Sequence, residues 1–470
     1  MAYRLLIDGQ LVDGASTLDV INPATGAVFE TCACADEAQL EQAIAAAKRA
    51  FPAWASLTHG ARRDYLNRLA DAVQARSDEF CTLITREQGK PLAVSRIEFD
   101  MSVGLLRWFA EQDLPLETIR QTDEGQVLEQ RTPLGVVAAI TPWNFPVHQL
   151  TLKVAPSLSV GNTMVAKPAP TTPLTAALFG ELAAGILPPG VLNVIIDANH
   201  LGDKITSHPD IAMVSFTGST ATGKRVMGSG ASTLKRLTLE LGGNDAAIVL
   251  DDVDVREIAP KVFQAAMINS GQVCLAAKRI YAPRSLYDAL CDELARLARE
   301  AVVGDGLDPK TQIGPMQNKQ QYDKVLQIIE EAKTLGTVIA GGHALDRAGY
   351  FIAPTIVRDL PDNARLVREE QFGPAIPVLA YDTIDEVIAR ANDSEYGLGG
   401  TIWTNDAERG LEVAMRIQSG TIWVNKLVEL PFDLPFGGAK QSGIGRESGL
   451  EGMKEFTQAK IINLANKVSA

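Results

Sequence analysis

The 470-residue sequence is poor in cysteine and histidine, and it has no long hydrophobic run. Its five cysteines are an odd number in a large chain, so a disulfide framework is not expected. Its five histidines show neither an HxxxH spacing nor a CxxC partner, so a structural metal site has no support. No apolar run approaches the ~18 residues that span a bilayer, and the N-terminus lacks the pattern of a signal peptide. We therefore expect a cytoplasmic protein that contacts no membrane.

Positive charge is also scarce. The chain has 44 Lys and Arg against 57 Asp and Glu, a formal net charge of −13. A chain this acidic is not expected to bind nucleic acid or an anionic membrane non-specifically. With 46% hydrophobic and 21% charged residues, the composition excludes a disordered tail protein and a coiled coil. At roughly 100–200 residues per domain, the length predicts about two to four domains.

From about residue 134, short apolar runs alternate with segments of helix length. Strands that are apolar throughout and separated by helices favour a parallel sheet covered on both faces. Ligands of such sheets bind beyond the carboxyl ends of the strands. A second series of alternating elements, starting near Asp252, predicts a second α/β lobe. The apolar runs of the first series lie at 135–141, 163–167, 191–196, 213–218, 237–243 and 246–250.

Three segments lie outside this pattern. The first 30 residues alternate and contain turns, which predicts short antiparallel strands. The polar segment 113–132 interrupts the first lobe, and the strand-like run KEFTQAKIINLA follows the second. We expect these last two segments to form a subunit contact.

The sequence FTGSTATGK, residues 216–224, predicts a strand, a glycine-rich turn and a helix. Backbone N–H groups at such a turn can hold a phosphate at the helix N-terminus. The spacing from Gly218 to Lys224 nearly matches a P-loop, but Arg225 stands where Ser or Thr would hold magnesium, which disfavours a nucleoside triphosphatase. The GxGxxG pattern is not matched either. From this motif alone, a tight turn without a ligand stays open.

Three side chains could carry chemistry. Glu240 lies in an apolar run, where burial would raise its pKa toward that of a general base; an ion-paired or solvated glutamate is the alternative. Cys274 lies in a non-periodic stretch after Gly271 and is either a reactive thiol or a small buried hydrophobe. Asn144 stands between two prolines, where a rigid amide could stabilise an oxyanion or cap a turn.

Seven motifs together resemble the signatures of the aldehyde dehydrogenase superfamily, in the family's order. They are TPWNFP (141–146), KPA (167–169), FTGSTATG (216–223), LELGG (239–243), GQVC (271–274), EEQFGP (369–374) and LPFGGAKQSGIGRE (434–447). The resemblance implies NAD- or NADP-dependent oxidation of aldehydes to carboxylic acids. It also implies an α/β fold with a Rossmann-like cofactor-binding domain, an α/β catalytic domain and a small β oligomerisation extension.

On this basis we assign four segments of the chain to domains. Residues 1–112 and 133–241 form the NAD(P)-binding domain, and residues 242–445 form the catalytic domain. Residues 113–132 and 446–470 form the oligomerisation segments of a homodimer or homotetramer.

The resemblance also implies roles for individual residues. Cys274 matches the nucleophile, which forms a thiohemiacetal and then a thioester. Asn144 and the Cys274 backbone N–H match the oxyanion hole, Glu240 matches the base, and Lys153 matches a lysine near the proton relay. Cofactor contacts are assigned to Trp143, Lys167, Gly218, Ser219, Glu370 and Phe372.

One position departs from many NAD-preferring members. They carry a ribose-binding glutamate three residues after the lysine of KPA, and here that residue is Pro170. Proline offers no acceptor and no charge to repel a 2′-phosphate, so either NAD or NADP is expected.

The substrate wall lacks the two arginines that bind the carboxylate in succinate-semialdehyde members, since Leu152 and Ile268 occupy their positions. Burying a carboxylate without a cation is costly, so we expect an apolar aliphatic or aromatic aldehyde. Two alternatives stay open: a semialdehyde dehydrogenase anchored by Lys426 or Arg279, and a catalytically silent relative that serves as a binding protein. The other wall positions are His148, Gln149, Val273, Leu275, Val428, Leu430 and Phe436.

Overall fold

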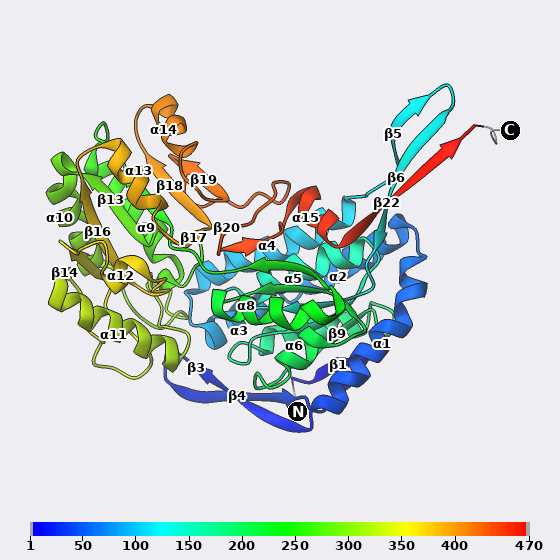
Figure 1. Ribbon diagram of the computed structural model, residues 1–470. Coiled ribbons are helices and arrows are strands. Elements are labelled where there is room, and N and C mark those ends of the chain that lie inside the picture. Colours follow the sequence, from blue (N-terminus) through cyan, green and yellow to red (C-terminus); the bar gives the residue numbers. More distant parts are fainter. Residues whose placement is uncertain (1–2, 467–470) are drawn as a thin grey trace.

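The computed structural model describes residues 3–466 and shows two α/β domains with a small sheet projecting from the first (Figure 1). The first domain is built on an eight-stranded sheet of order β2-β1-β9-β8-β7-β10-β11-β21. Its five central strands are parallel, and antiparallel strands close both edges. The strands are β1 (Leu5–Ile7), β2 (Gln10–Val12), β7 (Val136–Ile140), β8 (Thr163–Lys167), β9 (Leu192–Val194), β10 (Ile211–Thr217), β11 (Arg236–Glu240) and β21 (Gly443–Ile444).

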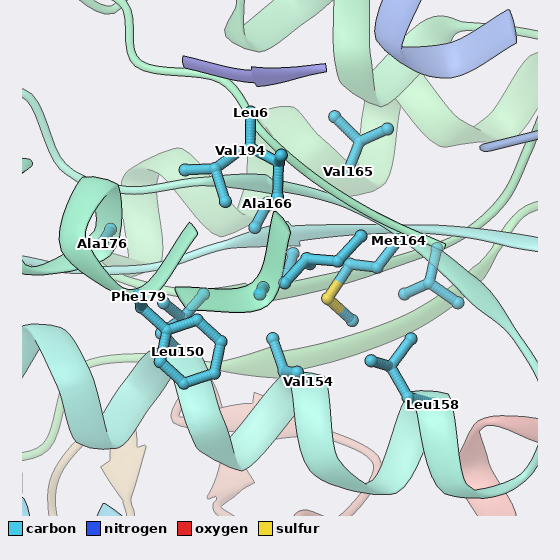
Figure 2. Packing of buried hydrophobic residues seen from close by; sticks show 14 of the residues in the cluster. Leu6, Leu150, Val154, Leu158, Met164, Val165, Ala166, Ala176, Phe179 and Val194 are labelled. Carbon is cyan, nitrogen blue, oxygen red and sulfur yellow. The ribbon is translucent and has the colours of Figure 1, made fainter. Parts of the chain in front are cut away.

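Eight helices accompany this sheet. The first begins at a capping box, in which Asp36 accepts a hydrogen bond from the Gln39 backbone N–H. In the core, Leu150 and Val154 of α5 lie close to Met164 of β8 and Phe179 of α6 (Figure 2). Burying each such side chain is worth about 1.5–3 kcal/mol. The helices are α1 (Glu37–Ala55), α2 (His59–Gln74), α3 (Ser77–Gln88), α4 (Leu92–Glu111), α5 (Pro146–Ser159), α6 (Leu174–Ala184), α7 (Gly202–Ser207) and α8 (Thr220–Gly230).

The second domain confirms the predicted second lobe. Its seven strands have the order β14-β15-β16-β13-β12-β18-β19, and every pair except β14 with β15 is parallel. The strands are β12 (Ala246–Val249), β13 (Arg279–Pro283), β14 (Thr337–Ala340), β15 (Thr355–Arg358), β16 (Ala375–Tyr381), β18 (Gly399–Trp403) and β19 (Thr421–Val424). The helices are α9 (Val255–Met267), α10 (Arg284–Glu300), α11 (Lys319–Leu335), α12 (Arg365–Arg368), α13 (Ile384–Asn392) and α14 (Ala407–Ala414).

The two segments expected outside the lobes pair with each other. Strand β22 (Thr457–Ala465) runs antiparallel to β6 (Gly125–Pro133), which also pairs with β5 (Glu117–Thr122). This sheet projects from the body of the molecule (Figure 1). Residues 467–470 of the expected oligomerisation segment, like residues 1–2, lie outside the described residues. The remaining small sheets pair β3 (Ser16–Asn22) with β4 (Ala27–Cys34), as the alternation near the N-terminus predicted, and β17 (Tyr396–Gly397) with β20 (Ala439–Lys440).

One boundary differs from the expected division of the chain. Residues 443–444 were assigned to the catalytic domain, but as β21 they pair with β11 of the first sheet. The open edge of β11 provides backbone groups that need partners, and the Leu241 N–H continues the pairing by donating to the Ser442 carbonyl at 2.9 Å. The chain therefore returns to the first domain before helix α15 (Gly449–Glu455). Within residues 3–466, no helix is both long and apolar enough to cross a membrane.

Candidate active site

An unusual turn presents Cys274. The residues before it, Asn269, Ser270 and Gly271, have φ values of 50°, 58° and 72°. Two consecutive non-glycine residues in the left-handed region are uncommon and need support from their surroundings. Ser270 provides part of it, since its hydroxyl donates to the Gly314 carbonyl at 2.8 Å. Gln272 provides more, since its side-chain amide donates to the Asn269 carbonyl at 3.0 Å. These two hydrogen bonds therefore support the left-handed backbone of the turn.

Cys274 opens into a cavity of about 180 Å³ between the two domains. It is half-buried, whereas Cys32, Cys34, Cys81 and Cys291 are buried. Burial raises the pKa of the Cys274 thiol to about 12, and nearby Lys278 opposes this rise. The cavity brings together Cys274, Asn144, Gln149 and all the residues assigned to the cofactor except Lys167. Its walls are Pro142, Trp143, Asn144, Gln149, Thr217, Gly218, Ser219, Leu241, Gly242, Gln321, Lys324, Glu370 and Phe372.

Asn144 is fastened to the turn that carries Cys274. Its side-chain amide donates to the Gln272 carbonyl at 3.0 Å, and its own carbonyl accepts from the Asn269 amide at 3.1 Å. The Lys90 ammonium, fully buried, also donates to the Asn144 carbonyl at 2.7 Å. These contacts hold the amide beside the cysteine, in keeping with an oxyanion donor rather than an isolated turn cap.

Lys90 forms a buried ion pair with Glu98 of α4. The second carboxylate oxygen of Glu98 accepts from the Val147 N–H at 2.9 Å, in the first turn of α5. One ion pair thus anchors both the Asn144 loop and the helix that follows it. Neither Lys90 nor Glu98 was predicted from the sequence, because an acid and a lysine eight positions apart carry no functional signal by themselves.

Glu240 is the last residue of β11, and only 4% of its surface is exposed. Its Oε1 atom has no hydrogen-bond partner among the described residues. Burial, reinforced by the negative charge of Glu447, raises the pKa of Glu240 well above the ordinary value. A carboxylate in this state can take a proton near neutral pH.

The charge of Lys153 lowers the pKa of Glu240, and Lys153 itself pairs with a second acid. Its ammonium donates to the Thr217 hydroxyl at 2.7 Å and forms an ion pair with Glu447 at 2.5 Å. The sequence analysis did not assign Glu447, although it is the last residue of the motif 434–447. Only the return of β21 to the first sheet brings it within reach of Lys153.

A larger cavity of about 750 Å³ adjoins the first one, at the carboxyl ends of β7, β8 and β10. The N-terminus of α8 faces it, and Ser219 caps that helix by accepting from the Thr222 N–H at 3.3 Å. The N–H groups at the start of a helix can hold a phosphate, and the 11-residue helix α8 begins at this cavity. The walls shared by both cavities are Pro142, Trp143, Thr217, Gly218, Ser219 and Gln321. The two cavities together therefore suit a dinucleotide that reaches from the sheet to Cys274.

The remaining cofactor assignments line these cavities. Lys167 borders the larger cavity, and its ammonium contacts Asp197 at 2.7 Å and Asn199 at 3.1 Å. Pro170 lies on the same wall. Asp197 was not predicted from the sequence. It places a carboxylate beside Lys167 from another loop, whereas Pro170 has no carboxylate. Trp143 and Phe372 meet edge to face, with ring centroids 5.3 Å apart.

Glu370 reaches the cysteine cavity from the second domain. Its carboxylate accepts from the Gly243 N–H at 3.1 Å and lies 3.8 Å from the Lys278 ammonium. Burial raises the pKa of Glu370, and Lys278 opposes that rise. A Cβ atom on Gly242 would lie 2.5 Å from the Glu370 carboxylate, so a side chain there would displace Glu370.

The expected substrate wall is only partly assembled around the thiol. Five of its positions form an apolar cluster with Cys274, together with Leu398 and Trp423, which the sequence did not single out; they are Val273, Leu275, Val428, Leu430 and Phe436. Gln149 lines the cysteine cavity itself. Leu152 instead packs in the core of the first domain, and Ile268 is half-buried at the end of α9. His148 is buried in α5, where desolvation lowers its pKa to about 4.

The two charged anchors considered for a semialdehyde have other partners. The Arg279 guanidinium is buried and donates to the carbonyls of Asn244 and Ala391, each at 2.9 Å. Lys426 is exposed and pairs with Glu429 at 3.2 Å. The Arg279 guanidinium is therefore bound to backbone carbonyls, and Arg279 does not line the cysteine cavity.

A cavity at the carboxyl ends of a parallel sheet, adjoining a second cavity between two α/β domains, is the arrangement of a dinucleotide-dependent oxidoreductase. The model of the aldehyde dehydrogenase family matches residues 11–462. An aldehyde dehydrogenase 1 from Tanacetum cinerariifolium is 39% identical over 98% of this chain and 94% of its own length. The chain belongs to the aldehyde dehydrogenase family, whose reaction is the oxidation of aldehydes to acids.

Solved structures agree with this assignment. The NAD⁺ complex of an aldehyde dehydrogenase from Bacillus cereus superposes with a TM-score of 0.97 at 36% identity, covering 99% of this chain and 97% of that one. An E. coli structure described as an NADP dependent enzyme superposes with a TM-score of 0.95 at 36% identity, covering 98% of both chains. These two structures are equally similar to this chain in sequence, but one is an NAD⁺ complex and the other an NADP dependent enzyme.

Proposed function

We propose that this protein oxidises an apolar aldehyde to its carboxylic acid through a covalent bond to Cys274, with NAD or NADP as the cofactor. The observation that carries the proposal is that Cys274 opens into a cavity lined by Asn144 and Glu370. The adjoining cavity at the α8 N-terminus suits the dinucleotide.

The first step is the attack of the Cys274 sulfur on the aldehyde carbon, which forms a thiohemiacetal oxyanion. The Asn144 amide and the Cys274 N–H are the two donors to that oxygen. Removing one such donor costs about 2.7–4 kcal/mol of transition-state stabilisation. Because Asn144 is tied to the cysteine turn by the Gln272 carbonyl, the donor and the nucleophile keep their relative position.

The dinucleotide, when bound, supplies the acceptor for the hydride that leaves the adduct. Ser219 and the N-terminal N–H groups of α8 would hold its phosphates, and Lys167 would contact its adenosine ribose. Glu370 would hold the nicotinamide ribose, beside Phe372. Since Pro170 is neutral and Asp197 is paired with Lys167, the residues present admit NAD or NADP.

The thioester that remains on Cys274 is hydrolysed by water. Glu240 takes the proton from that water, and the raised pKa of its buried carboxyl suits the task. Lys153 and Glu447 lie behind it as the groups that can pass the proton on, since they are joined by an ion pair of 2.5 Å. Release of the acid regenerates the free cysteine.

The substrate proposal rests on the apolar cluster around Cys274, which includes Trp423, Leu430 and Phe436. A panel of hexanal, benzaldehyde and succinate semialdehyde tests it through kcat/KM for each compound. We expect the two apolar aldehydes to be preferred by about tenfold or more, because a buried carboxylate without a cation costs several kcal/mol. A preference for succinate semialdehyde would reject the apolar pocket in favour of a semialdehyde dehydrogenase.

Two variants test the mechanism. Cys274→Ala should abolish aldehyde oxidation and leave dinucleotide binding, measured by fluorescence titration, nearly unchanged. Glu240→Gln should still give an initial burst of reduced dinucleotide, because the base acts after hydride transfer, but it should slow release of the acid. Turnover retained by Cys274→Ala would reject the covalent mechanism, whereas a parent protein that binds the dinucleotide but oxidises no aldehyde would be a catalytically silent relative. Loss of the burst in a folded Glu240→Gln protein would assign Glu240 an earlier role.

We also propose that the projecting sheet joins subunits into a homodimer or homotetramer. Strand β22 pairs with β6 along its full length, and Ile119, Ile461 and Leu464 on this sheet are exposed in the single chain. Exposed apolar side chains on a projecting sheet favour burial against another chain. Sedimentation of the parent and of an Ile461→Asp variant tests this, and an unchanged mass would reject the assignment.

A further inference from the structure

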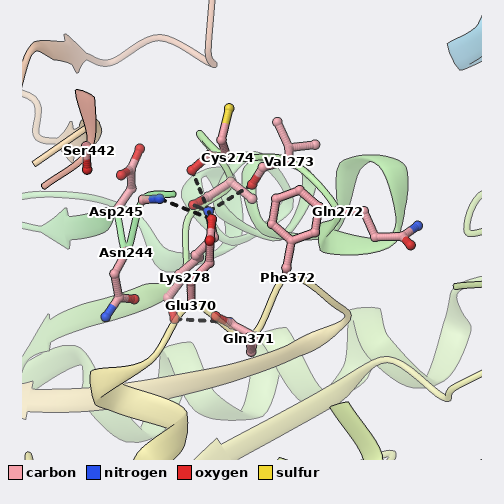
Figure 3. Close-up of polar contacts among 12 residues, drawn as sticks. Asn244, Asp245, Gln272, Val273, Cys274, Lys278, Glu370, Gln371, Phe372 and Ser442 are labelled. Carbon is pink, nitrogen blue, oxygen red and sulfur yellow. Dashed lines mark hydrogen bonds and ion pairs between the residues drawn. The ribbon is translucent and has the colours of Figure 1, made fainter. Parts of the chain in front are cut away.

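A lysine that the mechanism does not use lies beneath the cysteine turn. Lys278 is 1% exposed, and its ammonium donates to the carbonyls of Val273 at 2.8 Å, Cys274 at 2.5 Å and Ala276 at 3.4 Å. Figure 3 shows the Lys278 ammonium beside the carbonyls of Val273 and Cys274, with the sulfur of Cys274 pointing away from it. Three carbonyls from one turn are thus gathered on a single buried charge.

The geometry of the peptide bond makes this contact directional. In a trans peptide, the C=O of one residue and the N–H of the next point in opposite directions in one plane, and the described residues contain no cis peptide. Because the Val273 carbonyl points at Lys278, the Cys274 N–H must point away from it. That N–H has no acceptor among residues 3–466 and is available to a ligand.

We propose that Lys278 is a positioning residue: by holding the Val273 and Cys274 carbonyls from beneath, it aims the Cys274 N–H at the substrate oxygen. This inference rests on the proposed role of Cys274 as nucleophile. It adds an anchor for the backbone half of the oxyanion hole, as Lys90 anchors the Asn144 half through the Asn144 carbonyl.

The charge of Lys278 has a second effect on the same turn. The groups whose charges act on the Cys274 thiol are Lys278, which lowers its pKa, and Glu370, Asp245 and Glu240, which raise it. Lys278 is therefore the cation that opposes three acids and the burial of the thiol. Asp245 is itself buried, which raises its pKa to about 6, and it accepts from the Gly399 N–H at 3.1 Å.

Lys278→Met removes the donors and the charge while keeping most of the side-chain volume. We expect the burst of reduced dinucleotide to slow by about 10²–10³-fold, as for loss of one oxyanion donor. Because the Glu370 carboxylate lies 3.8 Å from the Lys278 ammonium, the dinucleotide Kd is measured separately and the burst is compared at saturating dinucleotide. Alkylation of Cys274 by iodoacetamide should shift toward higher pH by about one unit, because a nearby cation favours the thiolate.

Lys278→Gln separates the effect of the hydrogen bonds to the carbonyls from the effect of the positive charge. The glutamine side chain is smaller than lysine and is neutral. Its amide keeps two N–H donors, so the burst should be at least about tenfold faster than in Lys278→Met, whereas the alkylation profile should stay shifted. A purely structural role would change neither the burst nor the alkylation profile of a folded variant. If Lys278→Met does not fold, the test uses Lys278→Gln only. An unshifted alkylation profile together with a parental burst in Lys278→Gln would overturn the proposal.

Lys235→Met is the matched control. Lys235 is also buried and donates to the carbonyls of His208 and Ile211, in the first domain away from Cys274. It should lose stability without changing the alkylation profile, and an equal loss of burst in this control would overturn the role of Lys278. Turnover by Cys274→Ala would instead reject the proposed function. If Cys274→Ala is inactive but the Lys278 variants keep the parental burst and alkylation profile, only the role of Lys278 is rejected.

Discussion

Lys153→Met removes the cation that pairs with Glu447 and lowers the pKa of Glu240. The ion pair is buried, with side-chain exposures of 0% for Lys153 and 2% for Glu447 and a separation of 2.5 Å. At an effective dielectric constant of about 20, the attraction amounts to about 7 kcal/mol. Breaking a buried pair by removing one partner costs about 3–5 kcal/mol, because the other charge stays buried without compensation.

We expect Lys153→Met to change both the stability of the protein and the pH dependence of its activity. The free energy of unfolding in urea should fall by about 3–5 kcal/mol. Lys153 lowers the pKa of Glu240, so its loss should raise that pKa further and move the pH dependence of thioester hydrolysis to higher pH. Lys153→Met/Glu447→Gln should recover part of the stability and return the profile toward lower pH, because the repelling charge is gone.

Lys333→Met provides the control. Lys333 pairs with Glu330 on the surface of α11, with side-chain exposures of 38% and 64%, and such pairs are worth about 0–1 kcal/mol. Two results would refute the reasoning: a Lys153→Met protein that loses no more stability than this control, or a double variant less stable than Lys153→Met alone.

The remaining predictions concern two other buried groups. Asn144→Ala should lower kcat by about 10²–10³-fold with little change in KM, since the amide acts mainly in the transition state; equal kcat values would remove it from the oxyanion hole. Burial raises the pKa of Glu87 from 4.5 to about 7. The unfolded chain ionises first, so this group's contribution to stability should be full below about pH 4.5 and should decline by about 3 kcal/mol up to about pH 7. Urea midpoints at about pH 5 and pH 8 should therefore differ less in Glu87→Gln than in the parent, and equal differences would contradict the assignment.

Periodicity and composition were sufficient for the two α/β lobes, because strands apolar throughout and separated by helices have few other ways to bury their side chains. The local turn patterns near the N-terminus likewise predicted β3 and β4. The pairing of β21 with β11 was not predictable, because a two-residue strand carries no periodic signal and its partner lies about 200 residues away in the sequence.

The sequence by itself singled out the residues that we propose to carry the chemistry: Cys274, Asn144 and Glu240 lie in the motifs, and the resemblance to the family implied their roles. Only the tertiary structure decided which neighbours tune them. Lys278 and Glu447 act through charge at distances of a few ångströms, and the sequence does not encode these distances locally. They follow from how a turn folds back on itself and how a distant strand returns to the first sheet, and both depend on long-range packing.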